Sequence, residues 1–553
     1  MNLPIMTLIK AGTGRIRENK EPGRRTCVSA RFVFAAAVLL ASLPVAADLQ
    51  TVQVGGEIRI RGQYWRNSFD NPTATTYTGN MIRWPASALG GRPIGDPYGG
   101  QTIVSFFDWD DARDDYRLVE QRTRLNIRAD FSDSATAYTE LESYEAWGED
   151  FRSNYITAVD RRGNSDVEVY QAYIEVRDLF GSPLQLRLGR QEITLGSGWL
   201  VGNNNNLPEF GGLSFDAARL TWATDQFSVD ALWAKLAEQF NSWNDGDRDL
   251  FALYGSYTGL EAVAFDLYWV LLRDSAYLED TDATWLGEQI EGWLGLDDYE
   301  TTYLHTIGGR VHGESGGFDY NLEGAYQFGN ASRVGALFRP FGYGDADADF
   351  GAWAGDLELG YTFDHRLQPR VWLGAAYFGG EDERDITFWE WLNPFAMLVE
   401  PEASLSFNRL FSDKTYSAIL DDQGALTNFW TMCGGLSMAP TESTRVGLDA
   451  AWFEALEAFE QPIHIHWGRA RIPILAPLSF WTTPSDKELG WELGLWGEYA
   501  YSEDLVFRAG WRHFFTGDGS AEGNFVDLNG LLHNGGTDDQ DADYLYLESR
   551  VTF

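Results

Sequence analysis

The chain ends with Tyr544-Leu-Tyr-Leu-Glu-Ser-Arg-Val-Thr-Phe553, a stretch in which apolar and polar side chains alternate with only Ser549 out of place. One parity holds Leu545, Leu547, Val551 and Phe553, and the other holds Tyr544, Tyr546, Glu548, Arg550 and Thr552. Alternation with a period of two predicts a β-strand with one apolar and one polar face. A final strand of this kind can pair with the first strand and close a barrel, so it constrains every other segment.

Composition agrees with a barrel of the kind found in Gram-negative outer membranes. The 553 residues include 58 Gly and 22 Trp, and aromatic residues make up 15% of the chain. The mean hydropathy is only -0.29. In a transmembrane barrel every second residue faces lipid, aromatic girdles mark the two interfaces and the other side chains stay polar. A low average hydropathy is therefore compatible with a chain that crosses a membrane many times.

The N-terminus predicts a cleaved secretory signal peptide over residues 1–47. Seven Lys and Arg residues precede an apolar run at 32–45, and small residues lie just before Asp48. The run is too short to span a membrane as a helix. The long basic region leaves a start site downstream of Met1 open, and the pair Arg24-Arg25 leaves twin-arginine export as an alternative.

The mature chain predicted in this way is strongly acidic. Removing residues 1–47 takes away seven basic and two acidic residues and changes the net charge from -40 to about -45. This charge argues against a nucleic-acid partner. Cys433 is then the only cysteine, so no internal disulfide can form. No other apolar run approaches 18 residues, which argues against a helical inner-membrane protein.

Period-two alternation predicts an all-β fold, a transmembrane antiparallel β-barrel of about 18 strands over residues 48–553. Each strand has about nine to fifteen residues, the length that a tilted strand needs to cross a bilayer. The predicted strands are 54–66, 115–131, 135–147, 166–178, 184–195, 214–223, 226–237, 250–258, 261–273, 303–315, 317–329, 349–363, 369–379, 427–438, 442–454, 487–501, 504–516 and 541–553.

The connections between these strands alternate between short turns and long segments. Examples of short turns are 132–134 and 502–503, and examples of long segments are 67–114 and 380–426. Short periplasmic turns and long outer loops are typical of outer-membrane barrels, and an even strand number places both termini in the periplasm. Acidic clusters in the long segments, such as 108–115, predict a solvated outer rim. Calcium binding there stays an alternative, although no segment has the spacing of a calcium loop.

Two neighbouring segments carry the most distinctive pattern in the chain. They are Leu184-Gln-Leu-Arg-Leu-Gly-Arg-Gln-Glu-Ile-Thr-Leu-Gly196 and Leu213-Ser-Phe-Asp-Ala-Ala-Arg-Leu-Thr-Trp222. A Gly-Arg-Gln strand followed, after a loop, by a Phe-Asp-x-x-Arg strand resembles the alginate export family of outer-membrane channels. The matching residues are Gly189, Arg190, Gln191, Phe215, Asp216 and Arg219. The resemblance implies a monomeric barrel that passes an anionic polysaccharide or a similar solute, without implying alginate itself.

Strand parity leaves the roles of two of these residues open. If Leu188 faces lipid, Arg190 faces lipid too, at a cost of roughly 2 to 4 kcal/mol near the bilayer midplane. Either Gly189 forms a bulge that turns Arg190 inward, or the strand has left the bilayer at that point. Arg219 raises the same question against Phe215, and both Arg residues could instead hold a loop in place. The residues assigned here to the solute path are Arg187, Arg190, Asp216 and Arg219.

Arg residues gather on the polar faces of four strands that closure makes neighbours, namely the first two and the last two. In the second strand, for example, Arg122 and Arg124 oppose Leu125 and Ile127. The eight residues of this Arg wall are Arg59, Arg61, Arg122, Arg124, Arg128, Arg508, Arg512 and Arg550. Because rings of Arg are one way in which pores select anions, we expect them to form a continuous basic patch along the solute path.

Across the lumen, two predicted strands have acidic polar faces. The residues of this acidic wall are Asp319, Glu323, Asp356 and Glu358. Ordinary ion pairing inside the lumen explains charged side chains of this kind as well as a solute path does. The Arg residues suit a solute path because a guanidinium stays charged and forms paired hydrogen bonds with carboxylates, the chemical group of a uronate polymer.

These patterns predict a channel and not an enzyme. The expected solute is anionic, most simply a uronate-type polysaccharide or oligosaccharide that passes an Arg-lined lumen. The alternatives are a general porin for small solutes and, from other classes, a barrel enzyme or a surface adhesin. His464 and His466 are the one close histidine pair and lie in a long loop, so we predict no metal and no cofactor. Expected partners are outer-membrane lipid and, through the C-terminal strand, the barrel assembly machinery.

Overall fold

A computed structural model of the chain describes residues that all lie between Leu49 and Phe553. They are 49–67, 81–85, 101–105, 115–131, 134–147, 167–205, 212–238, 247–274, 301–331, 348–380, 403–405, 407–421, 424, 426–457, 461–462, 464–467, 470–473, 482–483, 486–521, 525–527, 531–533 and 541–553. The predicted signal peptide at 1–47 lies outside these residues and stays a prediction, as does the mature start at Asp48.

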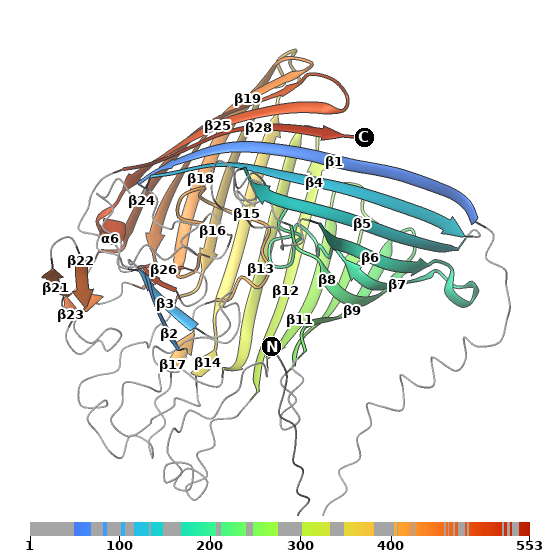
Figure 1. The fold of residues 1–553 in the computed structure, drawn as a ribbon, viewed down its shortest axis with the longest axis horizontal. Coiled ribbons are helices and arrows are strands. Elements are labelled where there is room, and N and C mark those ends of the chain that lie inside the picture. The colour runs from blue at the N-terminus through green and yellow to red at the C-terminus, as the bar shows by residue number, and fades with distance from the viewer. Residues whose placement is uncertain are drawn as a thin grey trace, which may run out of the picture. The chain divides into compact units, whose positions relative to one another are not determined.

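Within the described residues, twenty strands form one sheet that closes on itself (Figure 1). Two of the twenty, β14 (Ala348–Phe350) and β17 (Ala403–Leu405), have only three residues each. The long strands are β1 (Leu49–Arg66), β4 (Tyr116–Phe131), β5 (Ala135–Ala146), β6 (Glu168–Val176), β7 (Leu184–Gln191), β8 (Phe215–Ala223), β9 (Phe227–Ala237), β10 (Arg248–Tyr257), β11 (Ala264–Asp274), β12 (Thr302–Ser315), β13 (Phe318–Ala331), β15 (Trp353–Thr362), β16 (Arg370–Phe378), β18 (Phe429–Thr441), β19 (Thr444–Ala455), β24 (Glu488–Ala500), β25 (Leu505–Thr516) and β28 (Ala542–Thr552).

The first and last strands close the barrel, and Figure 1 shows β1 in blue beside β28 in red. β28 pairs antiparallel with β1 on one side and with β25 on the other, and β1 also pairs with β4. Phe553 continues the pairing: its N–H donates to the Gly56 carbonyl at 3.1 Å, and its carbonyl accepts from Gly56 N–H at 2.9 Å. Closure pairs the edges of both terminal strands. The predicted antiparallel barrel of 18 long strands is confirmed.

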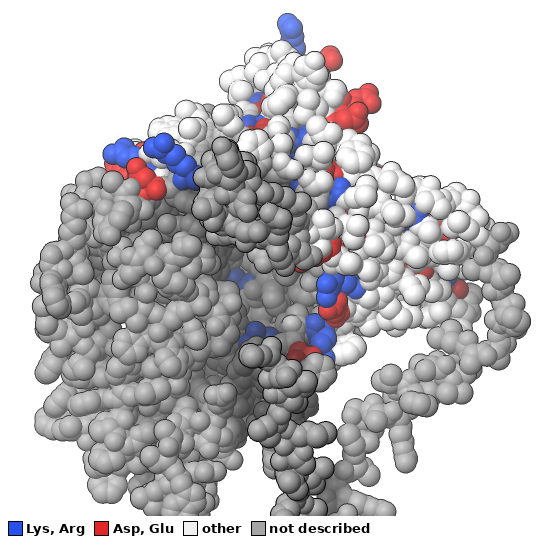
Figure 2. Space-filling view, viewed as in Figure 1, with Lys and Arg blue, Asp and Glu red and all other residues white. Residues whose placement is uncertain are grey.

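Side chains alternate between lipid and lumen along the strands, as the last ten residues predict. Leu545 and Leu547 point outward and are exposed, whereas Tyr544 and Glu548 point inward and are buried. In Figure 2 the described surface consists mostly of residues that carry no charge. An uncharged outer face and a polar inner face are what lipid on one side and water on the other require. None of the described helices is long and apolar enough to cross a membrane.

Some boundaries differ from those predicted, and one difference has a structural consequence. β1 begins at Leu49, five residues before the predicted start, and β15 begins at Trp353 instead of 349. The predicted strand 184–195 ends at Gln191, because residues 192–195 leave the wall and turn into the lumen. Gly316 and Gly317, with φ of 60° and 84°, form a two-residue turn, so β13 begins at Phe318, one residue after the predicted start.

Smaller elements lie in the connections between the long strands. They are β2 (Met81–Pro85), β3 (Gln101–Ser105), β26 (Phe525–Asp527) and β27 (Leu531–His533) in one sheet, the pairs β20 (Gln461–Pro462) with β23 (Thr482–Thr483) and β21 (His464–Trp467) with β22 (Ala470–Pro473), the 3-10 helix η1 (Leu179–Gly181) and the helix α6 (Asp518–Ala521). The predicted acidic rim, including 381–385 and most of 108–115, lies outside the described residues. Calcium binding by that rim therefore stays an open alternative.

Candidate solute path through the barrel

Two segments leave the barrel wall and fold into the lumen. They are residues 192–205, between β7 and β8, and residues 407–421, between β17 and β18. Val201 and Phe411 form a parallel β-bridge, and the Phe411 N–H donates to the Leu200 carbonyl at 2.9 Å. We call these two the inserted segments. Because they pair with each other, they occupy the lumen as one unit.

Glycine and aromatic residues explain how the first inserted segment folds. Gly196 and Gly198 have φ of 57° and 77°, values that favour glycine and allow a sharp turn. The following Trp199 is fully buried, and its ring lies 5.7 Å from that of Phe378 in the wall. Its indole N–H donates to the Tyr416 hydroxyl of the second segment at 3.0 Å. An aromatic core with a satisfied indole therefore joins the two segments to each other and to the wall.

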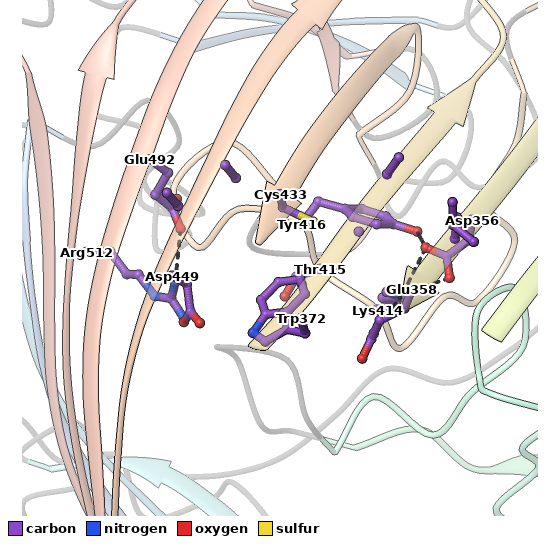
Figure 3. Close-up of a pocket in the computed structure, with 15 residues that line it drawn as sticks. Asp356, Glu358, Trp372, Lys414, Thr415, Tyr416, Cys433, Asp449, Glu492 and Arg512 are labelled. Atoms are coloured by element: carbon purple, nitrogen blue, oxygen red, sulfur yellow. Dashed lines mark hydrogen bonds and ion pairs between the residues drawn. The ribbon is translucent and has the colours of Figure 1, made fainter. Parts of the chain in front are cut away.

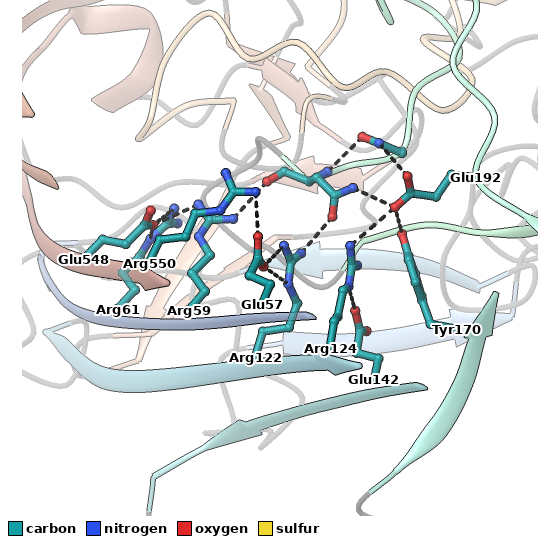
Figure 4. Close-up of polar contacts among 12 residues, drawn as sticks. Glu57, Arg59, Arg61, Arg122, Arg124, Glu142, Tyr170, Glu192, Glu548 and Arg550 are labelled. Atoms are coloured by element: carbon teal, nitrogen blue, oxygen red, sulfur yellow. Dashed lines mark hydrogen bonds and ion pairs between the residues drawn. The ribbon is translucent and has the colours of Figure 1, made fainter. Parts of the chain in front are cut away.

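The first inserted segment binds the Arg wall, as Figure 4 shows. Arg59 Nη1 donates to the Asn205 carbonyl at 3.0 Å, and Arg122 Nη1 donates to Asn205 Oδ1 at 2.8 Å. Arg124 lies 3.4 Å from a Glu192 carboxylate oxygen. Three residues that sequence analysis assigns to the solute path thus hold a loop inside the barrel.

The eight Arg residues share the inward face as predicted, but they do not form a continuous basic patch. Carboxylates from the same and neighbouring strands lie between them (Figure 4). The pairs are Arg59–Glu548 (2.8 Å), Arg61–Glu548 (2.6 Å), Arg122–Glu57 (2.6 Å), Arg550–Glu57 (2.6 Å), Arg124–Glu142, Arg508–Glu498 (2.8 Å), Arg512–Asp449 (3.1 Å) and Arg128–Asp130 (3.1 Å). Charges of both signs therefore alternate on this wall, and its net charge is far smaller than the Arg count suggests.

Exposure divides the Arg wall into two groups. The side chains of Arg59, Arg61, Arg122 and Arg124 are 6%, 8%, 2% and 7% exposed. Those of Arg128, Arg508 and Arg550 are 41%, 39% and 41% exposed, and Arg512, at 27%, lies between the two groups. The buried group is structural, because its guanidinium groups are enclosed by carboxylates and loop atoms. The exposed group retains donor atoms that a solute in the lumen can reach.

The four further residues assigned to the solute path separate into inward and outward pairs. Arg187 and Arg219 face the lumen, where they bind Glu175 at 2.6 Å and Asp230 at 2.8 Å. Arg190 and Asp216 lie on the outward face.

Arg190 and Asp216 do not line the lumen. They are cross-strand partners on β7 and β8, bound to each other at 2.9 Å, and both are exposed on the face that also carries Leu188 and Leu220. Gly189, with φ of 124°, does not turn Arg190 inward. Mutual neutralisation, near the end of β7 where the chain leaves the wall, explains how a charged pair is tolerated on the outward face.

The acidic wall binds the inserted segments from the opposite side. Asp356 accepts from Lys414 Nζ at 2.8 Å and from the Tyr416 hydroxyl at 2.6 Å. Glu323 accepts from the Ser197 hydroxyl at 2.8 Å. The two remaining residues are more exposed: Asp319 pairs with Arg370, and Glu358 lies 3.6 Å from Arg370 and 3.9 Å from Lys414.

The second inserted segment is not predicted by the sequence pattern. Arg409 and Asp421 form a fully buried ion pair at 2.7 Å inside it, and Ser417 donates to Glu492 of β24. Burial raises the pKa of the Asp421 carboxyl above its ordinary value, and the Arg409 guanidinium opposes that rise. These residues lie in a long connection without a period of two, so alternation gives no signal for them. The density of polar and aromatic residues in 407–421 is the one hint the sequence offers.

This arrangement suits passage or binding of a hydrophilic solute more than chemistry. Buried ion pairs and hydrogen bonds fix the inserted segments, and the more exposed Arg and acidic side chains border the remaining space. Among the described residues, no group of three or more His, Cys, Asp or Glu side chains could hold a metal ion.

Comparison with known proteins gives a family and a set of structural likenesses. A model of the family described as alginate export matches residues 104–529. None of the curated proteins compared with the sequence matches it. Solved structures that resemble the chain include two from Pseudomonas aeruginosa, OccD3 (OpdP) and OccK8 (OprE), each 11% identical with a TM-score of 0.44. The alignments cover 92% of this chain and 93% of OccD3, and 91% of this chain and 98% of OccK8. OmpT of Vibrio cholerae is 9% identical, with a TM-score of 0.34 over 92% of this chain and 100% of its own.

Proposed function

Because the chain belongs to the alginate export family, we propose that its outer-membrane barrel is a channel for an anionic saccharide of the uronate type. The observation that carries the anionic part of this proposal is the exposed group of the Arg wall, Arg128, Arg508 and Arg550. These residues lie on β4, β25 and β28, which β1 joins into one continuous part of the wall. A carboxylate moving along that part of the wall meets one guanidinium after another.

Partial pairing of these Arg residues favours transport over tight binding. Each shares its charge with a carboxylate, as Arg508 does with Glu498 at 2.8 Å and Arg550 with Glu57 at 2.6 Å. A solute carboxylate would have to compete with those partners, so its binding at any one Arg should be weak. Conduction needs binding that is favourable enough to enter and weak enough to leave.

We propose that the short turns and both termini lie in the periplasm, and that the barrel is a monomer assembled through its last strand. Arg128, Arg508 and Arg550 are all within a few residues of a short turn or the C-terminus. In the proposed orientation, the exposed Arg group lies near the periplasmic mouth. The test is a Ser502→Cys variant with Cys433→Ala, treated with a membrane-impermeant thiol reagent too large for the pore. Labelling in cells with intact outer membranes would contradict this orientation.

The experiment that tests the anion proposal is the reversal potential of the purified barrel in planar bilayers under a salt gradient. The unmodified channel should prefer anions, and the double variant Arg508→Ala with Arg550→Ala should lose that preference and be blocked less by oligouronates. Arg190→Ala is the matched control, because it removes an Arg from the outward face. Cation preference in the unmodified channel, or equal selectivity in the double variant, would contradict an anionic solute.

A general porin is the second candidate, and one observation favours it. Every Arg of the wall has a carboxylate oxygen within 3.1 Å. The lumen therefore offers donors and acceptors for many hydrophilic solutes. A porin of this kind would show weak selectivity and no preferential block by oligouronates over neutral sugars of equal size.

A further inference from the structure

A cavity lies in the lumen between the second inserted segment and the barrel wall (Figure 3). Its volume is about 230 Å³, below the roughly 300 to 1,000 Å³ of sites for drug-sized ligands, so it suits one small ring. Lys414, Thr415 and Tyr416 of the inserted segment form one side. Side chains from β15, β16, β18, β19, β24 and β25 form the other sides.

Small residues in register explain why this part of the lumen is hollow. One row of cross-strand partners runs Glu358, Gly374, Cys433, Ala451 and Glu492, and its three middle members have little or no side chain. The next row runs Trp372, Gly435, Asp449, Gly494 and Arg512. Large side chains therefore border the space at the two ends of both rows, and apart from Asp449 the residues in the middle are small and leave it open.

Trp372 lies along the wall of this cavity. A Cβ built on Gly435 would lie 2.5 Å from the Trp372 Nε1, and one built on Gly374 would lie 3.3 Å from its Cζ3. These atoms belong to opposite ends of the indole, so both ends rest on glycine backbone. The ring therefore lies flat against the wall, and Figure 3 shows it at the centre of the lining residues. An aromatic face held in this way is a preformed platform.

Hydrogen-bonding groups flank the platform on both sides. Asp449 lies on one side, held by Arg512 at 3.1 Å. Lys414 lies on the other, bound to Asp356 at 2.8 Å and 3.9 Å from Glu358. Four carboxylates and two cations line the cavity in all. This excess of carboxylates favours a ligand that donates hydrogen bonds and disfavours one that carries its own carboxylate.

We propose that the cavity is a subsite for one uncharged pyranose unit of the transported saccharide. The sugar ring lies on Trp372, its hydroxyl groups donate to Asp449 and Glu358, and its oxygens accept from Lys414. This inference rests on the proposed saccharide channel and narrows its substrate class. The solute would carry uncharged sugar units, which bind in the cavity, as well as carboxylates, which bind the exposed Arg group.

An aromatic ring over glycine is also a common way to stabilise a sheet, and the barrel contains an internal control for that role. Trp496 covers Gly447 in the same manner, with a Cβ on Gly447 only 2.4 Å from the Trp496 Cε2. Trp496 does not line the cavity. If Trp372 only stabilises the sheet, removing either ring should have the same effect.

The test is block of single-channel current by mannohexaose, measured for the unmodified barrel, Trp372→Ala and Trp496→Ala. Trp372→Ala should shorten the residence time of the sugar roughly tenfold, the order of effect expected for loss of an aromatic contact. Trp496→Ala should leave it unchanged. A methanethiosulfonate reagent on Cys433, the only cysteine of residues 48–553, should abolish block by filling the cavity.

Hexamannuronate provides the second arm of the test. Its residence time should not depend on Trp372, because a uronate unit is disfavoured in the cavity. Equal residence of mannohexaose in Trp372→Ala and the unmodified barrel, or equal losses in both Trp variants, would overturn the subsite. The reversal potential is measured on the same channels and tests the exposed Arg group. Failure of the anion proposal would appear in the reversal potential, whereas failure of the subsite would appear in the residence time of mannohexaose.

Discussion

The two walls of the lumen both carry charged groups, but they differ in how much space they leave open. On the Arg wall, Arg59 and Arg122 are buried among carboxylates and bind the first inserted segment. On the opposite wall, Gly374, Cys433 and Ala451 separate the charged groups and leave a cavity. Side-chain volume, more than the sign of the charges, therefore decides where a solute can lie.

The two walls also differ in the direction of their hydrogen bonds to the inserted segments. The Arg wall donates hydrogen bonds to carbonyl and amide oxygens of the first segment, such as those of Asn205. The opposite wall accepts hydrogen bonds from the second segment, as Asp356 does from Lys414 and Tyr416. The acidic wall is thus an anchoring surface as well as a border of the cavity.

The largest difference between the walls should appear when a buried Arg is removed. Arg124→Ala leaves Glu142 buried without its guanidinium and removes the contact of Arg124 with the Tyr170 ring, whose centroid lies 3.8 Å away. Loss of one member of a buried ion pair costs roughly 3 to 5 kcal/mol. Urea unfolding of the purified barrel, followed by its heat-modifiable migration on gels, measures this loss.

Arg508→Ala is the matched comparison on the same wall. Its side chain is 39% exposed, and an exposed ion pair contributes about 0 to 1 kcal/mol. Equal destabilisation by the two substitutions would contradict the division of the Arg wall into a buried and an exposed group.

On the opposite wall, Asp356→Asn should loosen the second inserted segment. It removes the charge that accepts hydrogen bonds from Lys414 and Tyr416, and hydrogen bonds to a charged group contribute roughly 1.5 to 3 kcal/mol. We expect more frequent opening transitions in single-channel records. Asp319→Asn is the control because Asp319 pairs with Arg370 of the wall strand β16, and a similar rise in opening for that variant would speak against anchoring by Asp356.

A smaller effect should follow from filling the row of small residues. Gly435→Ala places a Cβ 2.5 Å from both Trp372 Nε1 and Asp449 Oδ1, so the indole must shift, and overpacking of this kind costs roughly 1 to 3 kcal/mol. Block by mannohexaose should weaken together with stability. Gly497→Ala is the control, since the nearest atom to its Cβ would be 3.8 Å away, and weakening of the same size there would show that the cavity is not involved.

The smallest effect is expected for the outward pair. Arg190→Ala should change stability by less than about 1 kcal/mol, because charges near the membrane interface cost little to expose. Unfolding in urea measures it. A loss as large as that of Arg124→Ala would mean that the pair lies deep in the bilayer.

Strand pattern predicts much of this fold and only part of the site. Alternation in the last ten residues predicts the orientation of Tyr544 and Leu547 correctly, because a period of two fixes the face of every side chain in a paired strand. The same parity places Arg59 and Arg122 inside. It also places Glu57 inside. Parity together with the strand register is therefore enough to predict that carboxylates neutralise the Arg wall.

The inserted segments could not be predicted in this way. Trp199 and Tyr416 lie in connections without a repeating pattern, and their contact depends on two loops meeting from opposite walls. The row of small residues has the same limitation, because Gly374 and Cys433 become neighbours only through the register of β16 and β18. The local sequence therefore predicts the face on which each side chain lies, whereas the cavity depends on pairing between strands that are distant in the sequence.

The measurement that tests the central claim most directly is the conductance of a barrel from which most of the second inserted segment is removed. Residues 409–421 are replaced by a short Gly-Ser linker, and single-channel conductance is compared with that of the unmodified protein at the same salt concentration. If the inserted segments fill the lumen, conductance should rise severalfold and block by mannohexaose should disappear, because Lys414 and Tyr416 leave the cavity. Unchanged conductance in a correctly folded variant would contradict a lumen path controlled by these segments.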